Sequence, residues 1–167
     1  MQFKGLALVA SAFIFGACGG SDSAPAADAT TTPAADAAAP ASGTGTGTVA
    51  MAAATGATHE IRMVGDEKGY RFEPANLTIK SGDAVKFIAI SGFPHNVAFD
   101  GTTLAANVKA QLDANFGAGR AAELMSAMYM AANESATISF ANIPAGTYNF
   151  NCTPHLAMNM KGVLTVQ

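Results

Sequence analysis

A thiol, an imidazole and a thioether lie close together near the C-terminal end of the chain, at Cys152, His155 and Met160. A second imidazole, His95, lies far upstream in the segment Gly-Phe-Pro-His-Asn-Val. One thiolate and two imidazoles, with a weak thioether as fourth donor, form a trigonal soft-ligand set that suits copper cycling between Cu(I) and Cu(II). We therefore predict that these four residues bind one copper ion, and that the protein is a small electron carrier.

Two other metal sites use some of the same residues. Zinc could occupy the thiolate and the imidazoles, but it prefers four strong ligands and gains little from a thioether. The chain also has eight methionines, and a thioether cluster for Cu(I) could be drawn from those at 125, 128, 130, 158 and 160. Methionine commonly fills irregular gaps or lines adaptable surfaces, and Cys152 with two histidines already completes a site, so we favour that simpler interpretation.

Residues 1–17 have the features of a secretory signal. Lys4 precedes an apolar run from Leu6 to Phe15 that is too short to span a bilayer comfortably. Gly16 and Ala17 then precede Cys18, an arrangement that resembles the lipobox of bacterial lipoproteins. We expect export, lipidation of Cys18 and anchoring at the periplasmic face of a bacterial membrane, with ordinary cleavage further along as the alternative.

The chain has only two cysteines, and disulfides would be permitted outside the cytoplasm. If Cys18 carries lipid, Cys152 has no disulfide partner. A free thiol in an oxidising compartment is a liability unless a metal holds it, which again favours a metal at Cys152.

Charge excludes one class of partner. The chain has nine Lys and Arg against twelve Asp and Glu, and both signs are scattered. Because no basic cluster could follow a phosphate backbone, nucleic acid binding is not expected. Strong electrostatic steering of a partner is not expected either.

Composition divides the rest of the chain into a linker and a domain. Residues 18–57, after the signal, consist almost wholly of Ala, Thr, Gly, Pro, Ser and Asp and contain no aromatic residue. Such a segment cannot repay the entropy of ordering, so we predict a disordered leash behind the lipidated cysteine. Residues 58–167 form one domain, long enough to build its own core.

Short strands dominate the predicted domain. Alternating or continuous apolar runs bounded by Gly, Pro and Asn or Asp turns indicate an all-β antiparallel sandwich or barrel. The expected strands lie near 60–63, 76–80, 84–90, 96–100, 136–140, 147–152 and 162–167.

A helical insertion is expected around residues 103–130. Leu104, Val108 and Leu112 recur at helical spacing, and Thr102 or Thr103 is placed to cap the helix. Beyond two glycines, the Ala- and Met-rich segment 121–130 suggests a second helical piece.

The strand near 147–152 predicts where the thiol points. Residues two apart share a face, so Cys152 lies on the same face as Tyr148 and Phe150 and should point into the core. His155 and Met160 follow on a loop stiffened by Pro154, and His95 would come from a neighbouring loop. His59 alone is interpreted as an ordinary solvated or packed side chain.

These motifs resemble those of a known family. Phe-Pro-His-Asn-Val at 93–97, and Tyr-Asn-Phe-Asn-Cys-Thr-Pro-His at 148–155 with Met160 and Gly162, are similar to the plastocyanin and pseudoazurin branch of the cupredoxins. The resemblance covers about 58–167. It implies a Greek-key β-sandwich and a type 1 copper held by His95, Cys152, His155 and Met160. It also selects Met160 over Met158, the competing thioether.

The resemblance implies further roles. The backbone of Asn96 would help to hold the thiolate, beside the ligand loop that contains Pro154. His155 would present an imidazole edge at the surface, within an apolar docking patch made of Phe93, Leu156, Ala157 and Met158. Where plant members often have a tyrosine before the cysteine, this chain has Asn151.

The function implied is one-electron transfer outside the cytoplasm, without enzymatic activity. A monomer would exchange electrons with cytochromes, oxidases or reductases while a lipid anchor holds it at the membrane. The alternative is a periplasmic copper carrier or storage protein. A multicopper enzyme is disfavoured because three histidines cannot supply a trinuclear cluster as well.

Overall fold

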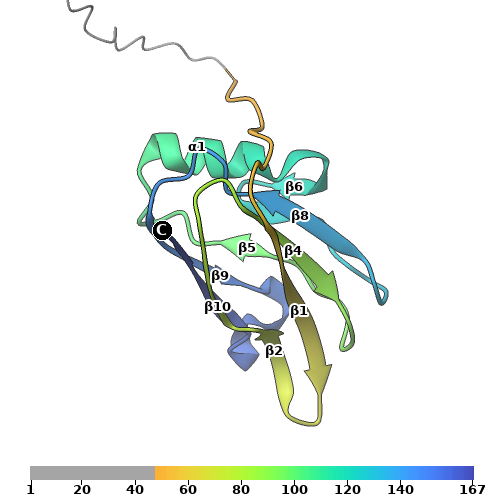
Figure 1. Cartoon of the computed structure of the whole chain (residues 1–167). Coiled ribbons are helices and arrows are strands. Elements are labelled where there is room, and N and C mark those ends of the chain that lie inside the picture. The colour runs from red at the N-terminus through yellow and green to blue at the C-terminus, as the bar shows by residue number, and fades with distance from the viewer. Residues whose placement is uncertain (1–47) are drawn as a thin grey trace, which may run out of the picture. The chain divides into compact units, whose positions relative to one another are not determined.

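Two β-sheets pack face to face in the computed structural model, which describes residues 48–167. One sheet has the order β2-β1-β4-β8 and contains β1 (Thr58–Asp66), β2 (Gly69–Glu73), β4 (Ala84–Ala89) and β8 (Ser135–Ser139). The other has the order β3-β10-β9-β5-β7-β6 and contains β3 (Asn76–Ile79), β5 (Ala98–Phe99), β6 (Arg120–Ala122), β7 (Met125–Ser126), β9 (Gly146–Asn151) and β10 (Lys161–Val166). The predicted β-sandwich is confirmed (Figure 1).

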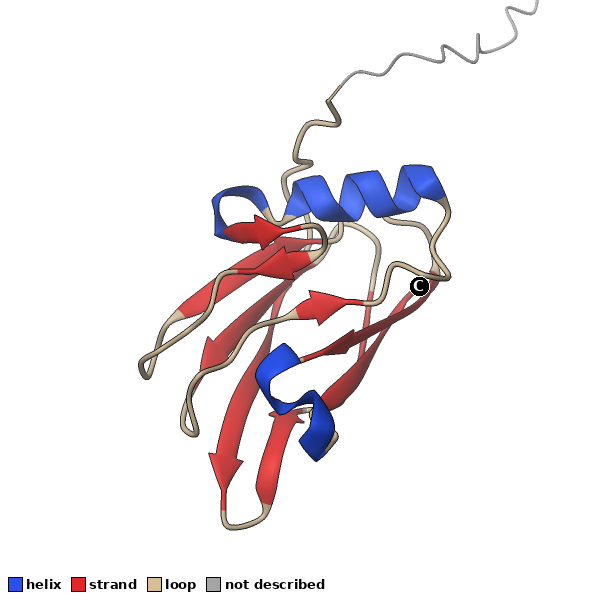
Figure 2. Cartoon of the chain, turned by 180° about the vertical axis from the view of Figure 1, so that it is seen from behind, coloured by secondary structure: helices blue, strands red, loops and turns tan. Residues whose placement is uncertain are grey.

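The helical elements are short and lie at opposite ends of the strands. Helix α1 (Ala106–Asn115) and the 3-10 turn η1 (Gly117–Gly119) lie across one end. The 3-10 segment η2 (Thr153–Met158) lies toward the other end, beside β2 (Figures 1 and 2). Among residues 48–167, none of the helices has the length and apolar character needed to cross a bilayer.

The period-2 alternation predicted from sequence explains the core. In β4, Val85, Phe87 and Ala89 are fully buried, and in β9 the inward positions Tyr148 and Phe150 lead to Cys152 as expected. The rings of Phe72, Phe87 and Phe99 surround Phe150 with centroid distances of 4.8, 5.4 and 5.6 Å respectively. This aromatic cluster fixes the strand that ends at the thiol, because edge-on and tilted rings of this kind pack at near-crystalline density.

Several sequence expectations are wrong in detail. The sheets are mixed, because β1 pairs with β4 and β3 with β10 in parallel. The strand expected near 96–100 is reduced to the two residues of β5, and the strand β2 was not expected at all.

The helical insertion around 103–130 is only half helical. Its first part is α1, but the N-cap is Ala105, and Thr102 instead hydrogen-bonds Asp100 through both its amide and its hydroxyl. The second part, expected to be helical at 121–130, forms the short strands β6 and β7. Leu124 has a positive φ of 55°, a conformation that a helix does not accommodate.

The folded part begins before Thr58. The amides of Thr55 and Gly56 both donate to the carbonyl of Gly82 at 2.9 Å. The amide of Ala52 donates to Asn115 Oδ1, also at 2.9 Å. Residues 52–57, assigned to the disordered linker, are therefore attached to the sandwich. The signal at 1–17, the lipidation site Cys18 and the linker up to residue 47 lie outside the described residues.

Candidate metal centre

The structure brings three of the four predicted ligands together. The Sγ atom of Cys152 lies 3.6 Å from His95 Nδ1 and 3.4 Å from His155 Nδ1, and all three donor atoms lie within 4.8 Å of one another. Three donors about 2 Å from a central ion are separated by about 3.5 Å in a trigonal arrangement. The geometry therefore fits one shared metal ion.

The loop after β9 positions Cys152, His155 and Met160. The amide of Cys152 donates to the carbonyl of Met160 at 3.1 Å, and the amide of Met160 donates to the carbonyl of His155 at 3.2 Å. Pro154 lies in the first turn of η2, and Asn159 caps its C-terminal end in the left-handed conformation with φ of 62°. These bonds close the loop on itself, so its ligands are placed before any metal binds.

Burial separates the two candidate thioethers. Met160 is fully buried, whereas Met158 is 53% exposed. Only Met160 therefore lies inside the protein with the three other predicted ligands. Its role as the fourth donor remains a prediction that agrees with this placement.

His95 enters from the loop between β4 and β5. Its backbone forms an isolated bridge with Tyr129, donating to the Tyr129 carbonyl at 3.0 Å and accepting from its amide at 2.7 Å. The Nε2 atom of His95 lies 2.7 Å from the carbonyl oxygen of Ser91. A carbonyl only accepts hydrogen bonds, so Nε2 carries the proton and Nδ1, which faces Cys152, keeps a free lone pair for a metal.

Asn96 joins the two loops that carry the ligands. Its side-chain Nδ2 donates to Thr153 Oγ1 at 2.9 Å, and its Oδ1 accepts from the Thr153 amide at 2.8 Å. The backbone amide of Asn96 also lowers the pKa of the Cys152 thiol, against the larger effect of burial. This direction agrees with the role expected of the Asn96 backbone, which stays a prediction, and the side-chain link to Thr153 is one that the sequence did not suggest.

Burial sets the protonation of the ligands. It lowers the pKa of His95, opposed by the Ser91 carbonyl, and lowers the pKa of His155, which the neighbouring His95 lowers further. Burial also raises the pKa of the Cys152 thiol, opposed by the amides of Asn96 and His155. Burial thus favours the neutral imidazoles that can coordinate, and a metal cation would displace the thiol proton on binding.

Comparison with known proteins identifies the family. Residues 59–167 match the family described as copper binding proteins, plastocyanin/azurin family. The chain belongs to the plastocyanin/azurin family.

Individual relatives agree with this assignment. A chloroplastic plastocyanin of Physcomitrium patens is 36% identical over 117 residues, which cover 70% of this chain and 61% of that relative, so the match spans less than two thirds of its length. A plastocyanin of Nostoc punctiforme is 35% identical over 115 residues, covering 69% and 78% of the two chains. The solved oxidised plastocyanin of Dryopteris crassirhizoma aligns with a TM-score of 0.51 and 32% identity, over 65% of this chain and all of that one.

Copper is therefore the metal of this site, as the ligand types predicted. In this cupredoxin the thiolate, two neutral imidazoles and the buried thioether of Met160 make a candidate type 1 copper site. Bound copper would supply a single redox centre. The protein supplies the ligand positions and a buried environment.

Two residues at the site were missed by sequence reasoning. Tyr70 of β2 stacks on the imidazole of His155, and Ser91 fixes the tautomer of His95. Neither has a motif-like spacing from the ligands. His155 itself is only 5% exposed, so any imidazole edge that reaches the surface is small.

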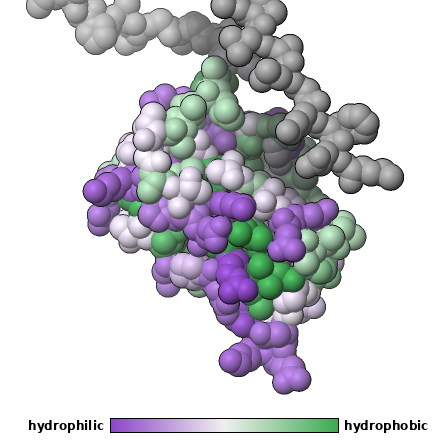
Figure 3. All heavy atoms as spheres, turned by 45° about the vertical axis from the view of Figure 1, so that its right-hand side comes forward, coloured by the Kyte–Doolittle hydropathy of each residue, from purple (hydrophilic) through white to green (hydrophobic). Residues whose placement is uncertain are grey.

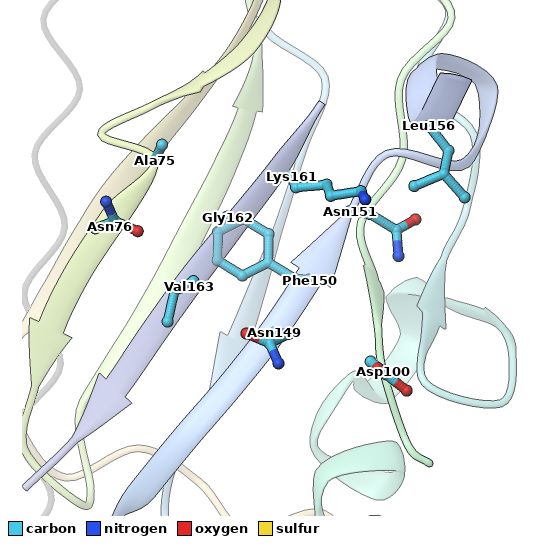
Figure 4. A pocket seen from close by; sticks show the side chains of 10 residues that line it. All are labelled: Ala75, Asn76, Asp100, Asn149, Phe150, Asn151, Leu156, Lys161, Gly162 and Val163. Carbon is cyan, nitrogen blue, oxygen red and sulfur yellow. The ribbon is translucent and has the colours of Figure 1, made fainter. Parts of the chain in front are cut away.

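One surface depression is separate from the ligands. It lies on the outer side of β9 and β10, where Asn149, Asn151 and Lys161 face outward, and Leu156 reaches its rim (Figure 4). Because none of the four predicted ligands lines it, this depression is not the metal site.

Proposed function

We propose that this protein is a one-electron carrier outside the cytoplasm, with a copper ion held by His95, Cys152, His155 and Met160. The observation that carries the proposal is the meeting of one thiolate and two imidazoles in a closed, buried site. A soft thiolate and a thioether stabilise Cu(I) without excluding Cu(II), so one electron can be gained and lost at the same ligands.

Rigidity supports electron transfer over metal delivery. The ligand loop is closed by backbone hydrogen bonds between Cys152, His155 and Met160, and Asn96 ties it to the loop of His95. An electron carrier works fastest when its ligands move little between oxidation states. A protein that delivers copper needs the opposite property, since its ligands must open to release the ion.

Partner binding is proposed at the ligand end of the sandwich. Leu156 and Met158 of η2 are 44% and 53% exposed, and Met128 and Met130 on either side of Tyr129 are 45% and 64% exposed. Because Tyr129 pairs with His95, these apolar side chains lie near both histidine ligands. They would form an adaptable contact surface for cytochromes, oxidases or reductases.

The proposed location rests on the N-terminal sequence. The apolar segment from Leu6 to Phe15 and the following Gly-Ala-Cys support export and lipidation at Cys18, with the monomeric copper domain held at the periplasmic face of a bacterial membrane. In cells that express the chain, Cys18→Ser should move the protein from the membrane fraction to the soluble fraction. Retention of this variant in the membrane fraction would overturn the lipid anchor.

Voltammetry of the copper-loaded protein tests the proposed function. A reversible one-electron wave that survives repeated cycling, with copper still bound at the end, supports an electron carrier. Loss of copper on reduction, with transfer to a copper-free acceptor protein, would instead establish a copper carrier. Cys152→Ser serves as the matched control, since it keeps the fold-forming shape of the side chain but removes the thiolate.

A further inference from the structure

An aromatic ring covers one of the copper ligands. The rings of Tyr70 and His155 lie 3.7 Å apart, centroid to centroid, at an angle of 17°, which is a stacked arrangement. Tyr70 also approaches His95 edge-on, at 6.3 Å and 65°. It belongs to β2, which contacts η2 although the two segments are far apart in the sequence.

The ring of Tyr70 lies in a slot formed by two glycines. A Cβ atom added at Gly65 would lie 2.7 Å from Tyr70 Cε1, and one added at Gly92 would lie 3.0 Å from the same atom. Gly92 also has a positive φ of 75°, which favours glycine. A side chain at Gly65 would overlap the tyrosine ring, and one at Gly92 would overlap the backbone of Gly65 and crowd the same ring, so the two glycines leave room for Tyr70 at this place.

The hairpin formed by β1 and β2, which contains Gly65 and Tyr70, is also linked to the second histidine ligand, His95. The amide of Gly65 donates to the carbonyl of Ser91 at 2.9 Å, and the Ser91 hydroxyl donates to the carbonyl of Gly65 at 3.0 Å. The Ser91 carbonyl is the acceptor for His95 Nε2. The β1–β2 hairpin therefore contacts His155 directly through Tyr70, and it is linked to His95 through Ser91.

The tip of the β1–β2 hairpin is polar, so an aromatic ring would find no apolar neighbours there. Asp66, Glu67 and Lys68 are exposed, and hydrophilic side chains cover this lowest part of the molecule in the space-filling view (Figure 3). Tyr70 turns away from that polar tip and is partly buried against the ligand instead.

We propose that Tyr70 is a positioning residue for the copper site: its ring holds the His155 imidazole in place and keeps water from one of its faces. This rests on the proposed function only in requiring that copper binds to His155. An offset or stacked aromatic pair is worth about 0.5–1.5 kcal/mol beyond its buried area, and an apolar shell around ligands raises the preference for the less charged Cu(I) form.

The test compares Tyr70→Leu, which removes the aromatic face, with Tyr70→Phe, which keeps it. Copper release from the reduced protein to a strong Cu(I) chelator should be roughly two- to thirteenfold faster in Tyr70→Leu, the range that such a ring pair supports. The reduction potential of this variant should also fall. Tyr70→Phe should match the unsubstituted protein within about twofold in release rate.

Nuclear magnetic resonance gives a second measurement that does not depend on copper retention. In the diamagnetic protein, the ring current of Tyr70 should shift the His155 ring protons upfield, and Tyr70→Leu alone should remove that shift. Equal release rates and equal potentials in Tyr70→Leu and Tyr70→Phe would overturn the proposal, as would His155 shifts unchanged by Tyr70→Leu. If the voltammetric test of the proposed function fails, the copper release rates and the His155 proton shifts can still be measured. The two proposals can therefore fail separately.

Discussion

The side chain of Asn96 offers a quantitative test of how the two ligand loops are joined. Asn96→Ala removes both hydrogen bonds to Thr153, of 2.9 and 2.8 Å. Each such bond contributes a net 0.5–1.5 kcal/mol, so the free energy of unfolding should fall by about 2 kcal/mol. Thr153 is exposed, and water can replace its lost partner, so the larger penalty for a stranded buried group should not apply.

The assay is urea denaturation of the metal-free protein, followed by far-ultraviolet circular dichroism. With a slope of about 1.5 kcal/mol per molar urea, the midpoint should fall by about 1.3 M. Thr153→Ser is the matched control, since it keeps both the hydroxyl and the amide that bond Asn96, and its midpoint should stay within about 0.3 M.

Thr153→Val separates the two bonds. It removes the hydroxyl acceptor and keeps the amide donor, and it leaves the Nδ2 group of the fully buried Asn96 without its acceptor. It should therefore cost about 1–3 kcal/mol, as much as Asn96→Ala or more. A loss below about 0.5 kcal/mol for Asn96→Ala would refute the reasoning, because the two hydrogen bonds would then contribute nothing measurable to joining the loops.

Two further predictions concern the sandwich around the site. A methyl group added by Gly162→Ala would overlap the ring of Phe150, so this overpacking should cost about 1–3 kcal/mol in urea denaturation; an unchanged midpoint would contradict it. The amide of Lys80, and then the ring of His59, lower the pKa of Asp83. A lowered carboxyl pKa stabilises the fold above the ordinary carboxyl value of about 3.9 and loses this effect as pH falls through the folded pKa. The urea midpoint should therefore drop below about pH 4, and Asp83→Asn should flatten that drop; an equal drop in both proteins would count against the assignment.

The sequence was informative wherever one residue type or one period decided the outcome. The alternation in Ala84–Ala89 predicted the buried face of β4 because burial on one side of a strand requires a period of two. The inward direction of Cys152 followed from the same rule. The ligand set could be identified because few metals suit a thiolate, two imidazoles and a thioether.

The misses arose where contacts distant in sequence decide the structure. β2 was missed although its sequence alternates apolar and polar residues from Tyr70 to Glu73, because so short a run between Gly69 and Pro74 also suits a turn. The segment 121–130 resembles a helix in its Ala and Met content, yet pairing with β5 and the bond from the Leu124 amide to Asp113 hold it extended. The stack of Tyr70 on His155 joins β2 to η2, two segments whose proximity only the folded chain reveals.

The most direct test of the copper site is a titration of the metal-free protein with Cu(II), followed by visible absorption. An intense blue thiolate-to-copper band should grow and saturate at one copper ion per chain, because Cys152 lies within reach of the same ion as His95 and His155. The Cys152→Ser variant should bind Cu(II) without developing that band. A colourless copper complex of the unsubstituted protein, or a blue band that persists in Cys152→Ser, would contradict the assignment of this sulfur as the copper ligand.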